Sequence, residues 1–124
     1  MSVKAENIQE RTFAFACRIV RLYQYLIKQD RLNDSLYRQL VRSGTSIGAN
    51  LEEANAAQSR ADFISKCHIA LKEARETHYW LRLFKNVELV SCAQMNDLLQ
   101  ESHEIVAILT TIVKNSKPKT SNIS

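Results

Sequence analysis

Apolar residues recur at alternating steps of three and four in four separate stretches of the chain, and this spacing is the strongest constraint on its fold. Because an α-helix repeats every 3.6 residues, the spacing places these side chains along one face of a helix. The first stretch shows the pattern through Ile8, Thr12, Phe15, Ile19, Leu22 and Leu26. The sequence therefore predicts four amphipathic helices, each with one face to bury.

Residue types that interrupt helices are almost absent. The chain of 124 residues contains two glycines and one proline, whereas sandwiches and barrels need a turn signal roughly every ten residues. Glycine-rich phosphate loops need glycines that this chain lacks. The composition thus disfavours many-stranded folds and favours one all-α domain.

Polar residues with capping chemistry mark where the helices begin. We expect the first helix over residues 8–30, with Asn7 as its N-cap, and the second over residues 36–57. The sequence Ser59-x-x-Asp62 is typical of a helix start and predicts the third helix from this point.

The fourth helix is expected to follow the capping sequence Ser91-x-x-Gln94 and to end near Lys114. Short connections between helices of similar length favour antiparallel neighbours, so residues 1–114 are predicted to form an up-down-up-down four-helix bundle. Residues 115–124 are polar and contain the only proline. We expect them to form a disordered tail.

The three cysteines are an odd number without a Cys-x-x-Cys pair, which is typical of reduced packing residues in a cytosolic protein. No apolar run approaches the roughly 20 residues that span a bilayer. The first ten residues are polar and mixed in charge, unlike a signal peptide. We therefore expect a cytoplasmic protein without a membrane segment.

Two helices carry a second apolar stripe, away from the face that the bundle buries. The stripes comprise Phe13, Val20 and Ile27 in the first helix and Ile69, Trp80 and Leu83 in the third. A monomeric bundle is expected to be polar there, so these six residues predict a homo-oligomer that covers them.

Gly44 and Gly48 fall inside the second helix, where each costs about 1 kcal/mol relative to alanine. Glycine lets another backbone come close, which would offset that cost. We expect a neighbouring helix to pack against both glycines, from this chain or from another subunit, rather than a ligand.

Sequence patterns of known catalytic sites are missing. None of the three histidines has a glutamate three residues before it, and there is no Gly-x-Ser-x-Gly. Glu52, Glu53 and His78 leave one mixed metal site open, although a hydrogen-bonded core histidine is the preferred interpretation. The sequence predicts a protein that is not an enzyme and holds no metal or cofactor.

Positive charge is concentrated between residues 11 and 42, which contain seven basic residues and two acidic ones. The candidate nucleic-acid-binding residues are Arg11, Arg18, Arg21, Tyr25 and Lys28 on the first helix and Arg38 and Arg42 on the second. Basic side chains neutralise phosphates, and the interleaved aromatic ring can stack on an unpaired base. The alternative is an ordinary solvated face.

Two stretches of the chain carry a resemblance to a known family: residues 42–54, RSGTSIGANLEEA, and residues 70–83, ALKEARETHYWLRL. They resemble the 23S rRNA intervening-sequence protein family, whose usual second-helix pattern is Ser-Ile-Pro-x-Asn-Ile-Ala-Glu-Gly. Ser46, Ile47, Asn50 and Glu53 match this pattern, whereas Gly48 replaces the proline and Ala54 replaces the final glycine.

The resemblance implies an antiparallel four-helix bundle, assembly as a ring-like homopentamer, and no established enzymatic activity. Members of the family are encoded within insertions in bacterial 23S rRNA genes. A similar fold is used by the accessory subunit of diversity-generating retroelements, which binds a reverse transcriptase and nucleic acid. Two hypotheses follow: the chain binds RNA or DNA, or it is an adaptor for a protein such as a reverse transcriptase.

Overall fold

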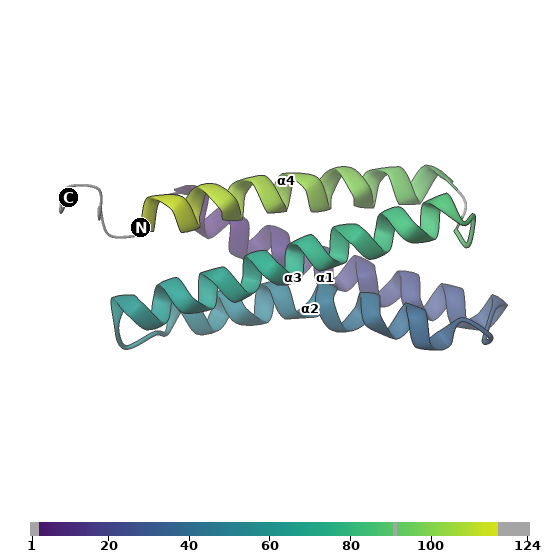
Figure 1. Ribbon diagram of the computed structural model, residues 1–124, viewed down its shortest axis with the longest axis horizontal. Helices are drawn as coiled ribbons and strands as arrows, with labels where there is room; N and C mark the ends of the chain where they lie inside the picture. The colour runs from purple at the N-terminus through teal and green to yellow at the C-terminus, as the bar shows by residue number, and fades with distance from the viewer. Residues whose placement is uncertain (1–2, 91, 117–124) are drawn as a thin grey trace, which may run out of the picture.

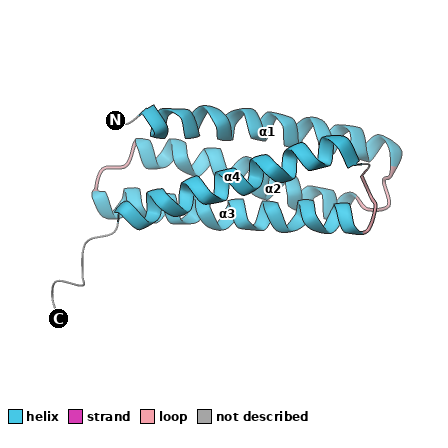
Figure 2. Cartoon of the chain, turned by 90° about the horizontal axis from the view of Figure 1, so that it is seen from above, coloured by secondary structure: helices cyan, strands magenta, loops and turns pink. Residues whose placement is uncertain are grey.

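The computed structural model describes residues 3–90 and 92–116, which form four α-helices joined by short turns. The helices are α1 (Val3–Gln29), α2 (Asp34–Asn55), α3 (Arg60–Asn86) and α4 (Cys92–Ser116). They run alternately up and down, as Figures 1 and 2 show. The predicted all-α four-helix bundle is confirmed.

Neighbouring helices pack in the order α1, α2, α3 and α4, and α4 closes the ring against α1. The contact between α4 and α1 is much less extensive than the other three, and the backbones of α1 and α3 do not approach each other closely. Among the described helices, none is long and apolar enough to cross a membrane.

The predicted apolar face of α1 forms one side of the core. All six of its members are buried, from Ile8 at the start of the face to Leu26 at its end. Facing them are the largest buried side chains of the other helices, including Tyr37, Leu81 and Met95. The spacing of apolar residues thus determines which face each helix turns inward.

Several predicted helix ends differ from the observed ones. Because α1 begins at Val3, Asn7 lies inside the helix, and its prediction as an N-cap is wrong. α4 runs two residues beyond Lys114. The remainder of the predicted tail, residues 117–124, lies outside the described residues, as does Ser91 of the predicted fourth cap.

The cap of α3 is the one that sequence reasoning predicts correctly in detail. Ser59 has extended backbone angles, and its side chain accepts a hydrogen bond from the backbone N–H of Asp62 at 3.0 Å. α2 starts differently, since its N-cap Asn33 makes no side-chain cap bond. The carboxylate of Asp30 organises that turn by accepting bonds from Leu32 N–H, Asn33 Nδ2 and Tyr37 O–H.

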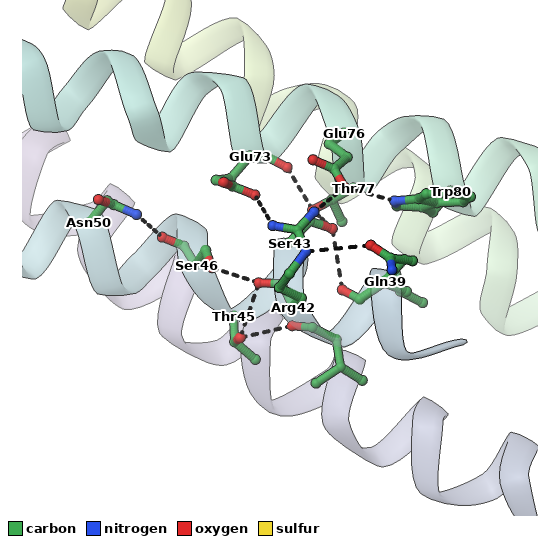
Figure 3. Close-up of polar contacts among 12 residues, drawn as sticks. Gln39, Arg42, Ser43, Thr45, Ser46, Asn50, Glu73, Glu76, Thr77 and Trp80 are labelled. Atoms are coloured by element: carbon green, nitrogen blue, oxygen red, sulfur yellow. Dashed lines mark hydrogen bonds and ion pairs between the residues drawn. The ribbon is translucent and has the colours of Figure 1, made fainter. Parts of the chain in front are cut away.

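A buried pair of hydroxyls joins α2 to α3. Thr77 Oγ1 lies 2.9 Å from Ser43 Oγ, and it also donates to the backbone carbonyl of Glu73. Figure 3 shows this pair beside Arg42. Both side chains are small, which lets the two helices approach closely while each hydroxyl keeps a hydrogen-bond partner.

The two glycines of α2 face α1 of the same chain. A Cβ atom on Gly44 would lie 3.0 Å from Cγ2 of Ile19, which is closer than side chains normally pack. A Cβ atom on Gly48 would lie 3.4 Å from Oγ1 of Thr12, an ordinary contact. The predicted neighbouring helix is therefore α1, and Gly44 is the more tightly packed of the two glycines.

Substituting each glycine by alanine separates these two positions. We expect Gly48→Ala to raise the free energy of unfolding by up to about 1 kcal/mol, because helix propensity improves without a clash. Gly44→Ala gains the same propensity but pushes on fully buried Ile19, so we expect a net loss of about 1 kcal/mol. Urea denaturation of both variants checks this, and equal effects would contradict it.

Candidate nucleic-acid interface

Three of the predicted binding residues converge on a groove between α1 and α4. Arg18, Arg21 and Tyr25 of α1 line it together with Leu22, and Leu98 contributes from α4. The groove has a volume of about 380 Å³, and Tyr25 is 51% exposed. It therefore combines two guanidinium groups, an accessible aromatic ring and an apolar wall.

The helical spacing of α1 explains this arrangement. Residues 18, 21, 25 and 28 are separated by steps of three, four and three, so they follow one flank of the helix. Lys28 is exposed one turn beyond the groove. Within the described part of the chain, Arg18, Arg21 and Lys28 make no ion pair, so their charges are available to a ligand.

Arg11 is placed differently from the other basic residues of α1. Its guanidinium group donates to both carboxylate oxygens of Glu101, at 3.0 and 2.6 Å, and to Glu104 at 2.7 Å. These hydrogen bonds raise its pKa, and the side chain is only 25% exposed. Arg11 thus connects α1 to α4 where their contact is sparse, and its charge is already balanced.

The two basic residues predicted on α2 are also paired with acids. Arg38 forms an ion pair of 2.9 Å with Asp34, one turn earlier in the same helix. Arg42 reaches across to α3, where it pairs with Glu73 and Glu76, as Figure 3 shows. The structure therefore brings Arg18, Arg21 and Tyr25 together and leaves Arg38 and Arg42 in separate surface contacts.

Sequence reasoning missed Leu98 and the acids of α3 and α4. Leu98 follows the apolar spacing of its own helix, which indicates burial but not that it borders Tyr25. Glu101 and Glu104 lie about ninety positions from Arg11 in the sequence, so a local count of charge cannot pair them. Of the ion pairs made by Arg11, Arg38 and Arg42, the Asp34–Arg38 pair alone has the i, i+4 spacing that a sequence reveals.

The six residues predicted to cover an oligomer interface differ in exposure. Phe13 is 71% exposed, whereas Ile27, Trp80 and Leu83 are half-buried against the core of their own bundle. Val20 and Ile69 are half-buried as well. The wide core thus uses part of both stripes, and the homo-oligomer stays a prediction.

The residues considered for a mixed metal site lie apart. Nδ1 of His78 is 2.8 Å from Oγ of Ser102, whose hydroxyl donates to the carbonyl of Leu99, so the imidazole faces α4. Glu53 pairs with Lys66, which lies roughly 18 Å from His78 along α3. Within the described residues, no three metal-ligating side chains form a group that could hold an ion.

Comparisons with known proteins agree on one family. The family model described as 23S rRNA-intervening sequence protein matches residues 4–111. A crystal structure from Bacteroides thetaiotaomicron, described as a protein with unknown function from the S23 ribosomal protein family, is 45% identical to this chain. The match covers 90% of this chain and 99% of that one, with a TM-score of 0.84. No curated protein matches the chain.

Arg11 is expected to contribute to stability rather than only to surface charge. We expect Arg11→Met to lower the free energy of unfolding by about 1–2 kcal/mol, because Glu101 loses charge-assisted hydrogen bonds in a partly buried site. Arg18→Met is the matched control, since Arg18 is exposed and makes no ion pair with any residue that the structure describes; its effect should stay within about 0.5 kcal/mol. Equal losses in denaturant titrations would contradict this assignment.

His78 is expected to make stability depend on pH. Burial lowers its pKa, and the neighbouring Arg82 and His103 act in the same direction. The unfolded chain therefore binds a proton more readily, so stability should fall as pH decreases through about 6.5. His78→Gln should reduce this loss between about pH 7.5 and pH 5.5, where most carboxylates stay ionised. Identical pH profiles for the two proteins would contradict the assignment.

Proposed function

The chain belongs to the 23S rRNA-intervening sequence protein family, and we propose that it is a non-catalytic protein whose α1 flank binds single-stranded nucleic acid. RNA is the preferred ligand in this proposal. The observation that carries the proposal is the convergence of Arg18, Arg21 and Tyr25 on the groove beside α4. These three side chains supply the two kinds of contact that an unpaired strand needs.

The chemistry of the groove suits a nucleotide in an extended strand. Two guanidinium groups can bind phosphate oxygens through paired hydrogen bonds. The ring of Tyr25 can stack on a base, and Leu22 with Leu98 provides apolar surface beside it. Double-stranded nucleic acid would use the cations but not the ring, because its bases are already stacked.

Assembly would strengthen binding of this kind. The family resemblance implies a ring-like homopentamer, and Phe13 is the most exposed of the six residues predicted to lie at an interface. Several copies of the flank on one particle would raise both the local positive potential and the avidity for a long strand. Mass measurement in solution, with and without RNA, tests assembly and binding together.

The alternative is that a protein partner, and not nucleic acid, binds to the same cations. An acidic surface, such as that of a reverse transcriptase subunit, would be attracted to Arg18, Arg21 and Lys28 but would gain less from Tyr25. Replacing Tyr25 by leucine should therefore weaken single-stranded RNA binding by roughly fivefold or more. An unchanged RNA affinity in this variant would favour the protein adaptor.

The α1 flank is tested by the dependence of binding on salt. We expect the triple variant Arg18→Ala, Arg21→Ala, Lys28→Ala to bind single-stranded RNA more weakly, with the slope of log affinity against log salt reduced by about two. A matched triple at helix ends, Arg60→Ala, Lys85→Ala, Lys114→Ala, removes the same charge and should keep the slope. Absence of RNA retention by the unaltered protein at low salt would refute the proposal.

A further inference from the structure

The outward side of α3 repeats the pattern of the α1 flank. Both helices carry the order basic-x2-basic-x3-Tyr-x2-basic. We call the first set the α1 stripe, Arg18, Arg21, Tyr25 and Lys28, and the second the α3 stripe, Lys72, Arg75, Tyr79 and Arg82. All eight side chains are exposed. Each stripe is roughly 15 Å long, since ten residues separate its first and last members.

The two stripes lie on helices that are not neighbours in the bundle, and they run in the same direction. α1 and α3 are separated by one helix in an up-down-up-down bundle, so their chains are parallel, and their backbones do not approach each other closely. Each packs between α2 and α4. One protein molecule therefore presents two separate surfaces with the same order of charge and aromatic ring.

The cations of the α3 stripe lie next to acids that pair with a different residue. The acidic residues between them, Glu73 and Glu76, turn toward α2 and pair with Arg42. Figure 3 shows both carboxylates directed at that guanidinium group. Within the described residues, Lys72, Arg75 and Arg82 make no ion pair, so the stripe presents a net positive charge to solvent.

The aromatic ring of the α3 stripe is held in place. The ring of Tyr79 packs edge-on against Trp80, with centroids 5.2 Å apart. Trp80 is fixed in turn, because its indole N–H donates to Glu76 at 3.1 Å and Glu76 is held by Arg42. Tyr79 is nevertheless 54% exposed. A ring that is both positioned and accessible loses little conformational entropy when a base stacks on it.

We infer that the α3 stripe is a second contact for single-stranded nucleic acid, which binds another segment of the strand held by the α1 stripe. The inference rests on the proposed function, because it assigns the same ligand to a surface with the same spacing of charge and ring. A strand that reaches both stripes gains avidity through the second, intramolecular contact. A short oligonucleotide occupies one stripe only.

The experiment compares three triple variants of the full chain. The first removes the cations of the α1 stripe (Arg18, Arg21 and Lys28 to alanine), the second those of the α3 stripe (Lys72, Arg75 and Arg82 to alanine). The third is the matched control at Arg60, Lys85 and Lys114. All nine side chains are exposed, so the variants should fold, and circular dichroism checks this.

Two RNA probes give distinguishable readouts. With a labelled oligouridylate of roughly four nucleotides, which matches the length of one stripe, we expect each stripe variant to bind half as many molecules per chain as the control, with the affinity of the remaining site unchanged. With an oligouridylate several times longer, we expect each stripe variant to lose at least about tenfold in affinity. A further variant that combines the α1 and α3 substitutions should bind neither probe.

The outcomes separate this inference from the proposed function. If the α3 variant keeps the control's stoichiometry and its affinity for the long strand, the inference is wrong while the α1 groove stands. If the α1 variant keeps both, the proposed function is wrong. An acidic peptide that binds through Lys72, Arg75 and Arg82 in place of RNA would also overturn the inference.

Substitution of Tyr79 tests base stacking on its ring separately from the charges of the stripe. We expect Tyr79→Ala to weaken binding of the longer oligouridylate by about 5- to 150-fold, the loss of one stacked base. Tyr79→Phe keeps the ring and should bind as the unaltered protein does. A duplex of the same length should bind all three proteins equally. An unchanged single-strand affinity in Tyr79→Ala would contradict the role of the ring.

Discussion

The position of α2 between α1 and α3 is the constraint on which the rest of the structure depends. Gly44 brings α2 against Ile19 of α1, and the adjacent Ser43 contacts Thr77 of α3. Two neighbouring small residues thus fix α2 against both partners at one level of the bundle. With one side of α1 committed to α2, its opposite flank is left facing the sparse contact with α4, where Arg18, Arg21 and Tyr25 lie.

This packing sorts the charges of the protein into two classes. Cations that point across a helix contact meet an acid on the next helix, as Arg11 meets Glu101 and Arg42 meets Glu76. Outward cations without an acid one turn away, such as Arg18 and Arg21, are left unpaired among the described residues, whereas Arg38 pairs with Asp34 of its own helix. The proposed binding surface therefore consists of the cations that remain after the bundle has paired its own charges, which is why a local charge count overestimates it.

The sequence predicts the fold well because helices are specified locally. Apolar spacing identifies the buried face of α1, and the chemistry of Ser59 with Asp62 identifies one helix start. Asn7 fails as a cap because its chemistry suits a helix start while nothing in the flanking residues stops the helix. The groove is not predictable in the same way, since it needs Leu98 beside Tyr25, and that depends on how α4 crosses α1.

The sequence and the structure indicate different roles for Trp80. As the only tryptophan on an outward stripe, it is expected at an oligomer interface; in the structure it is half-buried and supports Tyr79. A subunit contact that covered Trp80 would also cover Tyr79, so it would compete with nucleic acid for the α3 stripe. A contact through Phe13 would not, because Phe13 lies near Glu52 of α2, on the side of α1 away from α4. The proposed assembly would therefore be compatible with the proposed strand binding if its subunit contact used the side of the bundle that carries Phe13.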